Sequence, residues 1–166
     1  MAAKLLLCAL VIALGGALGY YTGRKYVIRE KILSDFMALC GYMRNNISFL
    51  HTPLEPMLAE YSDKVSPHTK MIFDSFIASL KEGGEVKDAV EKSARKELKE
   101  GDKELITKLL VSLGKYDPDG QAAALNGFEA LFDESRKDAA ELKKKYYPLC
   151  FKLGALAGAG LAILIL

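Results

Sequence analysis

The side chains that could carry out chemistry are few and lie far apart in this sequence. The histidines and cysteines are His51, His68, Cys8, Cys40 and Cys150. A hydrolase or metalloenzyme requires His, Cys, Asp or Glu clustered at ligand spacing, or a glycine-rich phosphate loop. The glycine pair in residues 83–87 lacks the rest of such a loop. The sequence therefore predicts a non-enzymatic protein without catalytic, cofactor or metal sites, whose thiols are packed in a reducing compartment.

Asp117 and Gln121 form the most distinctive polar pair, because they lie four residues apart where the chain turns after Gly114. One interpretation is structural: Asp117 caps a helix and Gln121 lies on the surface of that helix. The other is a corner of the domain that faces a partner protein. The spacing does not decide between them, so Asp117 and Gln121 are candidate partner-binding residues.

Glycines recur every four residues at both ends of the chain, at Gly15, Gly19, Gly23, Gly154 and Gly158. This spacing places small residues on one face of a helix, which lets two helix backbones approach closely within a membrane. The competing explanation is that glycine is simply frequent in membrane helices. The pattern predicts helix packing, and it leaves open whether the contact forms within one chain or between chains.

Two apolar segments, residues 5–21 and 149–166, are predicted to be transmembrane helices. The first has 17 uncharged residues and the second is interrupted only by Lys152. Crossing the hydrocarbon core takes roughly 17–25 residues, so both segments reach the lower limit. A cleaved signal peptide is the alternative for the first segment, with 17–19 as a small-residue cleavage site. The basic residues that follow it oppose export of that flank, and they favour a retained helix.

The residues that border the two spans predict an orientation. Basic residues follow the first span and precede the second: Arg24, Lys25, Arg29, Lys31, Lys137, Lys143, Lys144 and Lys145. The tyrosine pairs 20–21 and 146–147 border the spans on the same side. Positive flanks face the cytoplasm and tyrosines concentrate at membrane interfaces, so residues 22–146 are expected in the cytoplasm. The nearly balanced charge of this middle part argues against a nucleic-acid partner.

Apolar residues at three- and four-residue steps predict an all-α fold, an up-and-down bundle of about six helices between the two spans. The first helix should continue from the membrane to about Asn46. Two start signals follow, in residues 52–55 and at Ser66-Pro67, and Gly83-Gly84 ends the second of these helices. A fourth helix is expected from about Glu85 to Glu100. A fifth should begin at Gly101-Asp102, and a last one near Asp117-Pro118 that continues through Tyr146 into the second span.

Several motifs in their order along the chain resemble one known family. These are the N-terminal span with basic residues after it, His51-Thr52-Pro53-Leu54, the run from Gly114 to Gln121, and the closing segment from Lys145 to Leu166. Together they resemble the stage III sporulation protein AB family, and the resemblance covers nearly the whole chain.

The resemblance implies a protein of endospore-forming bacteria that belongs to the stage III sporulation A assembly between mother cell and forespore. That family is similar to the inner-membrane platform proteins of type II secretion and type IV pilus systems, whose cytoplasmic helical domains meet an ATPase. It implies a scaffold in the mother-cell membrane around the forespore, with other stage III sporulation A proteins, including the ATPase subunit, as partners and self-association as a further option. The alternative is a membrane-anchored adaptor that docks one soluble regulatory partner.

Overall fold

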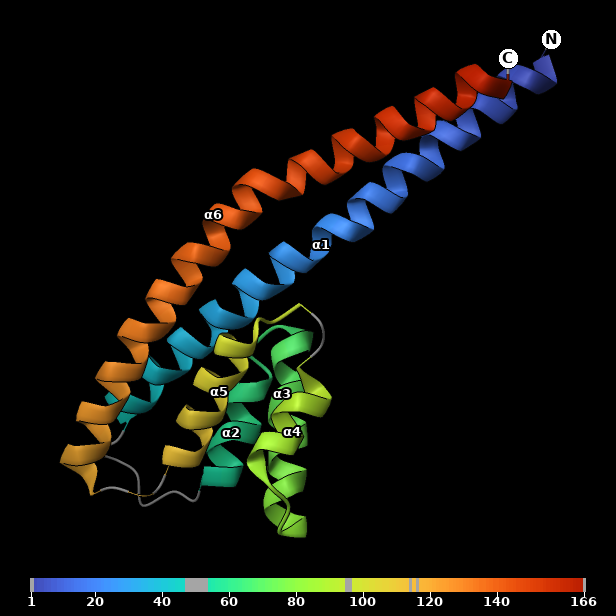
Figure 1. Ribbon diagram of the computed structural model, residues 1–166. Helices are drawn as coiled ribbons and strands as arrows, with labels where there is room; N and C mark the ends of the chain where they lie inside the picture. Colours follow the sequence, from blue (N-terminus) through green and yellow to red (C-terminus); the bar gives the residue numbers. More distant parts are fainter. Residues whose placement is uncertain (1, 47–53, 95–96, 114, 116, 166) are drawn as a thin grey trace. The chain divides into compact units, whose positions relative to one another are not determined.

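The computed structural model describes residues 2–46, 54–94, 97–113, 115 and 117–165, and these residues contain helices and no strand. The all-α prediction is thus confirmed for the described residues. The helices are α1 (Ala2–Asn46), α2 (Leu54–Ser62), α3 (Pro67–Glu82), α4 (Val86–Ser93), α5 (Glu100–Ser112) and α6 (Pro118–Ile165) (Figure 1).

The two longest helices, α1 and α6, each join an apolar segment to the polar middle of the chain. As predicted, α1 continues without interruption to Asn46, and α6 continues from the polar part past Tyr146 to the end of the second apolar segment. Pro148 lies inside α6. Its missing N–H removes one helical hydrogen bond without ending the helix.

The chain packs as two compact units. One consists of residues 1–28 with 138–166, and the other of residues 29–137. We call them the paired-helix unit and the bundle unit. The predicted limits of the membrane helices, 5–21 and 149–166, concern the position of a bilayer and stay predictions, as does the domain limit of 22–146.

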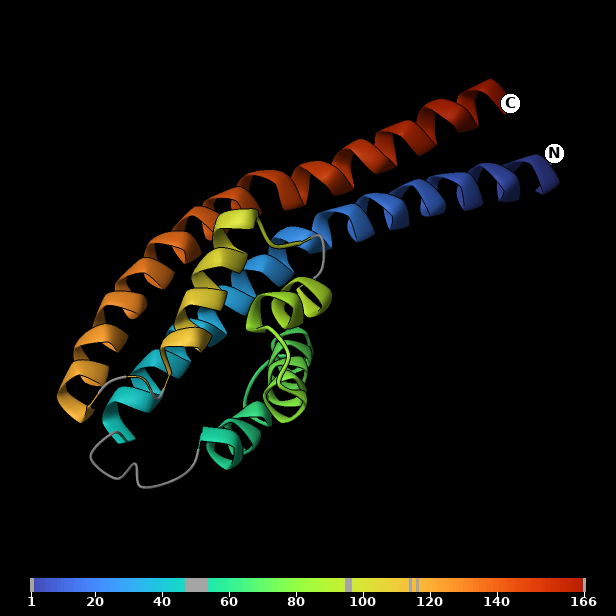
Figure 2. The same cartoon turned by 60° about the horizontal axis from the view of Figure 1, so that its bottom comes forward.

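The core of the bundle unit is built around Phe36 of α1. Its ring stacks on Phe132 of α6, with centroids 5.6 Å apart, and meets Phe73 of α3 edge-on at 5.3 Å. All three rings are fully buried. Offset and edge-to-face aromatic pairs add to the free energy gained from apolar burial. In the bundle unit α1 therefore contacts both α3 and α6, while α3 packs on α4 and α4 packs on α5 (Figure 2).

Both predicted signals of α3 are present. The Ser66 hydroxyl accepts a hydrogen bond from the Thr69 N–H at 3.4 Å, and Pro67 occupies the first helical position. At the other end Gly83 adopts φ 68°, a left-handed conformation that glycine adopts without steric cost. The predicted start signal of α2 at Thr52-Pro53 lies outside the described residues.

The fourth helix is shorter than predicted. It ends at Ser93 instead of Glu100, and Ala94 has an extended backbone. The apolar stripe on which the prediction was based continues through Ala94 and Leu98, which are both buried, although α4 itself ends at Ser93. The next helix starts at Glu100, where the Asp102 carboxylate accepts the Lys99 N–H at 3.0 Å and so satisfies a free donor of the new helix.

Candidate functional site

In the paired-helix unit, the glycines of α1 face those of α6 within one chain. A Cβ atom on Gly15 would collide with the Gly154 carbonyl oxygen and would lie 3.0 Å from the Gly158 Cα. A Cβ on Gly154 would meet the Gly15 carbonyl oxygen, and one on Gly19 would meet the Cys150 carbonyl oxygen. No other residue fits these positions without separating the two backbones.

The contacts on either side fix the direction of the two helices. Cys8 lies at Ala162, with its Sγ 3.6 Å from the Ala162 carbonyl oxygen, and a Cβ on Gly23 would lie 3.0 Å from the Tyr147 ring. As the α1 residue number rises, that of its α6 neighbour falls, so the segments are antiparallel (Figure 1). The five predicted packing glycines share one interface in the structure. Their role in a membrane stays a prediction.

The predicted interface tyrosines also gather at one end of this unit. Tyr20 meets Tyr147 with ring centroids 6.2 Å apart, and Tyr26, which the prediction did not include, stacks on Tyr146 at 5.5 Å. Each of these pairs joins α1 to α6. Tyrosine rings combine an apolar body with a polar tip, which suits the boundary between lipid and water.

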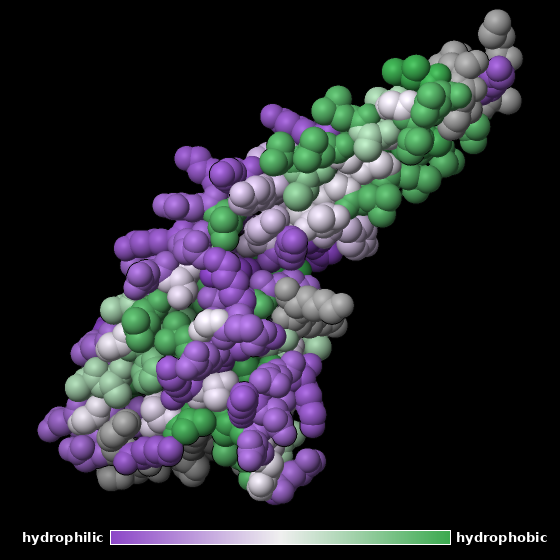
Figure 3. All heavy atoms as spheres, in the orientation of Figure 1, coloured by the Kyte–Doolittle hydropathy of each residue, from purple (hydrophilic) through white to green (hydrophobic). Residues whose placement is uncertain are grey.

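Most apolar side chains of the paired-helix unit point outward. The large exposed residues include Leu6, Leu10, Leu14, Leu18, Leu153, Leu156, Leu161 and Ile163. Only 22% of the most apolar stretch of α1 and 11% of that of α6 is buried, and both helices are long and apolar enough to cross a membrane. In Figure 3 the hydrophobic colour covers much of the part of this unit that carries both termini. An exposed apolar surface of this extent indicates an interaction with lipid or with another protein.

The structure places the predicted partner-binding residues in different environments. Asp117 is exposed and directly precedes α6, whereas the Gln121 side chain in the first turns of α6 is buried, with an exposed fraction of 6%. Their backbones are joined by a hydrogen bond from the Gln121 N–H to the Asp117 carbonyl oxygen at 2.8 Å. Partner binding at Asp117 and Gln121 stays a prediction, and in this conformation only Asp117 can reach a partner directly.

A buried ion pair between α1 and α5 is absent from the sequence-based predictions. The Arg29 guanidinium donates to both carboxylate oxygens of Asp102, at 2.6 and 3.0 Å, and both side chains are about 5% exposed or less. The sequence pattern places Arg29 in the basic flank of the first membrane span. The position of Arg29 in the sequence could have indicated the ion pair. Arg29 lies on the apolar stripe of Ile32 and Leu33, where a charged residue requires a buried partner.

A second buried carboxylate, Asp35 of α1, receives the start of α3. It accepts hydrogen bonds from the Ser66 N–H at 2.9 Å and the Thr69 hydroxyl at 2.8 Å, and Lys31 pairs with it at 3.0 Å. Burial raises the pKa of Asp35, but the hydrogen bonds from Ser66, Thr69 and Lys31 outweigh burial, so the pKa lies below its ordinary value. Asp35 thus orients α3 on α1, a role that the sequence did not indicate.

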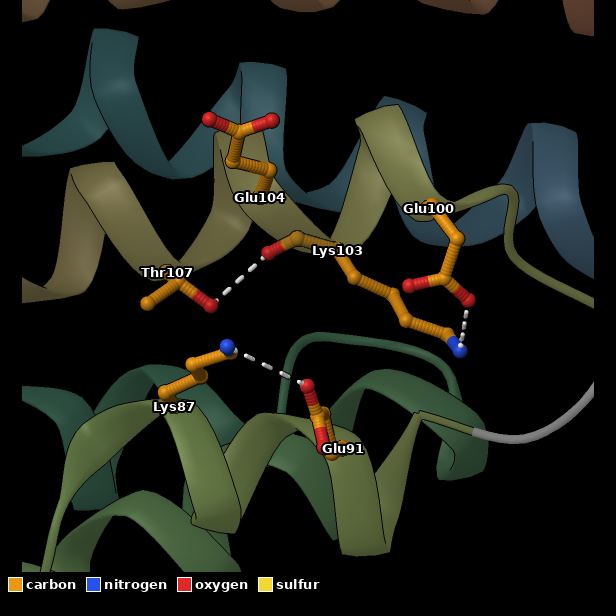
Figure 4. A pocket seen from close by; sticks show the side chains of 6 residues that line it. All are labelled: Lys87, Glu91, Glu100, Lys103, Glu104 and Thr107. Carbon is orange, nitrogen blue, oxygen red and sulfur yellow. Dashed lines mark hydrogen bonds and ion pairs between the residues drawn. The ribbon is translucent and has the colours of Figure 1, made fainter.

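The bundle surface has a polar groove between α4 and α5 (Figure 4). Lys87 and Glu91 of α4 point toward α5, whose Glu100 and Lys103 pair at 2.7 Å. Among the residues that the structure describes, no three His, Cys, Asp or Glu side chains gather as metal ligands. Burial raises the pKa of the Cys40 thiol to about 12, which keeps it protonated and unreactive. The charged side chains that line the groove are suited to contact with a polar partner.

Comparison with known proteins shows which family the chain belongs to. The model of the stage III sporulation protein AB family matches residues 4–166, nearly the entire chain. The chain belongs to this family. No curated protein and no solved structure shows significant similarity to it. The family resemblance inferred from the sequence is therefore confirmed, and it identifies a sporulation protein.

Proposed function

We propose that this sporulation protein is a non-enzymatic membrane platform of the stage III sporulation A assembly, which links mother cell and forespore and is required for sporulation. The paired-helix unit anchors the chain in the mother-cell membrane. The bundle unit faces the cytoplasm and docks the ATPase of the assembly. Family membership supports a role in sporulation, and the architecture supports a scaffold.

The observation that carries the proposal is the contrast between the two units of one chain. The paired-helix unit leaves its apolar side chains exposed while its glycines and tyrosines join the two helices. The bundle unit has a buried aromatic core and a buried ion pair. A docking platform requires a membrane anchor and a folded domain in one chain, and these two units supply them.

Isolation of the tagged full-length chain from sporulating cells after mild cross-linking tests this proposal. A platform should bring down the ATPase together with other stage III sporulation A proteins. Recovery of one soluble partner from outside the assembly, without the ATPase, would support the adaptor alternative and contradict the platform.

Asp117 allows the docking surface to be examined in the same experiment. If it faces the ATPase, Asp117→Ala should reduce ATPase recovery, while the loss of a helix cap costs only about 0.5–2 kcal/mol and leaves the domain folded. Asp119→Ala is the matched control, because Asp119 is also exposed and lies two residues away. Equal ATPase recovery with both variants would exclude Asp117 from the docking surface.

A further inference from the structure

Four exposed cations lie near the tyrosine end of the paired-helix unit. Arg24 and Lys25 belong to α1, and Lys144 and Lys145 belong to α6. Within the described part of the chain none of the four forms an ion pair, in contrast to most lysines of the bundle unit's helices, such as Lys103. Their charges are therefore available to a ligand.

One lysine of each helix lies against a ring of the same tyrosine stack. Tyr26 and Tyr146 stack with an angle of 20° between their rings. The Lys25 Nζ lies 5.1 Å from the Tyr26 ring centroid, and the Lys145 Nζ lies 5.3 Å from that of Tyr146. Each helix thus contributes an ammonium group to the same aromatic pair, and cation–π attraction holds both there.

The charge of the unit favours an anionic ligand. Residues 1–28 and 138–166 contain seven basic residues and two acidic ones, Asp138 and Glu141. The ammonium and guanidinium groups of such a cluster pair well with phosphate oxygens.

We propose that Arg24, Lys25, Lys144 and Lys145 bind the headgroup of an anionic phospholipid. The inference rests on the membrane insertion in the proposed function. The same unit exposes apolar side chains that lipid would cover. The acyl chains of one lipid molecule can therefore contact these side chains while its headgroup contacts the cations. Basic residues beside a membrane helix attract anionic lipids in this way. An acidic protein segment would satisfy the charges but would leave the adjoining apolar surface uncovered.

The test uses the full-length chain in phosphatidylcholine vesicles that contain a trace of spin-labelled lipid. Electron paramagnetic resonance measures the fraction of label immobilised at the protein, for phosphatidylglycerol and for phosphatidylcholine. We expect the association constant for phosphatidylglycerol to exceed that for phosphatidylcholine about twofold or more. High salt should reduce this preference, because it screens exposed charges.

Three variants separate charge from fold. Replacing all four cations with glutamine should abolish the preference, and Lys25→Arg with Lys144→Arg and Lys145→Arg should retain it. The matched control removes four exposed lysines of the bundle unit and should also retain it: Lys64→Gln, Lys87→Gln, Lys92→Gln and Lys108→Gln. Equal association of both lipids with the wild type, or an unchanged preference in the four-glutamine variant, would overturn the inference.

Two further measurements identify the source of a failure. Inorganic phosphate added at constant ionic strength should leave the preference for phosphatidylglycerol intact. If phosphate abolishes this preference, the four cations bind free phosphate instead of lipid. Resistance of the reconstituted chain to carbonate extraction reports insertion. A chain that does not insert contradicts the membrane anchor of the proposed function, whereas an inserted chain without lipid preference contradicts only the headgroup site.

Discussion

Arg29 and Asp102 withdraw two opposite charges from water, and each compensates the desolvation of the other. Removing one partner leaves a buried charge, so we expect Asp102→Leu to lower the free energy of unfolding by about 3–5 kcal/mol. The double variant Arg29→Met with Asp102→Leu should recover much of this loss, because it leaves no buried charge. Urea unfolding of the full-length chain in detergent, followed by circular dichroism, measures both changes.

The surface pair of Lys108 and Glu104 is the control for this cycle. Their side chains are 65% and 67% exposed, and they lie 2.8 Å apart. Exposed ion pairs are screened by solvent, so Glu104→Leu should change the unfolding free energy little. Equal effects of Asp102→Leu and Glu104→Leu would contradict the structural role of the buried pair.

Asp35 makes stability depend on pH in a defined direction. Its pKa in the folded chain lies below the ordinary value of 3.8, so folding favours the ionised form. The resulting stabilisation is complete above about pH 4 and is lost as the pH falls through the lowered pKa. The difference in unfolding free energy between wild type and Asp35→Asn should therefore shrink below pH 4. A difference that grows toward acid pH would show that the pKa is raised instead.

At the level of helices, the antiparallel register of α1 and α6 predicts a cross-link within one chain. Cys8 lies against Ala162, so Ala162→Cys should form a disulfide with Cys8 on mild oxidation in a chain whose other cysteines are replaced by alanine. The product should migrate as a monomer in a non-reducing gel. Leu161→Cys is the control, because Leu161 is 55% exposed and should react poorly. A disulfide-linked dimer as the main product would mean that the contact forms between chains.

Gly19→Leu adds a test of the glycine contact itself. A leucine side chain at this position would collide with the backbone at Cys150 and should lower the cross-linking yield. Leu18→Ile is the matched control, since Leu18 is 69% exposed and changes shape without entering the interface. Equal yields from both variants would leave the glycine spacing without a packing role.

Local sequence signals predicted the ends of a helix well where residues close in sequence form the hydrogen bonds at those ends. Ser66, Pro67 and Gly83 set the ends of α3 through contacts within a few residues, and these ends are as predicted. The start of α5 involves a more distant contact, because Asp102 both accepts the Lys99 N–H and binds Arg29, 73 residues away. Periodicity alone could not reveal that partner. The same reason explains why Asp35 was missed and why the burial of Gln121 could not be foreseen.

At the scale of the whole molecule, the two units differ in which side chains they expose, because α1 and α6 each have an apolar part and a polar part. The paired-helix unit exposes leucines that water solvates poorly, whereas the bundle unit buries its aromatic rings. Family membership places this architecture in sporulation. The proposed function requires above all that two membrane helices hold the bundle unit in the cytoplasm.

Cysteine accessibility in intact cells tests that claim most directly. In a chain without its native cysteines, Lys4→Cys and Ala78→Cys place exposed thiols before the first span and on α3 of the bundle unit. A membrane-impermeant maleimide should label position 4 in intact cells and position 78 only after lysis. Labelling of position 78 in intact cells, with position 4 protected, would reverse the orientation and remove the bundle unit from the side where an ATPase can bind.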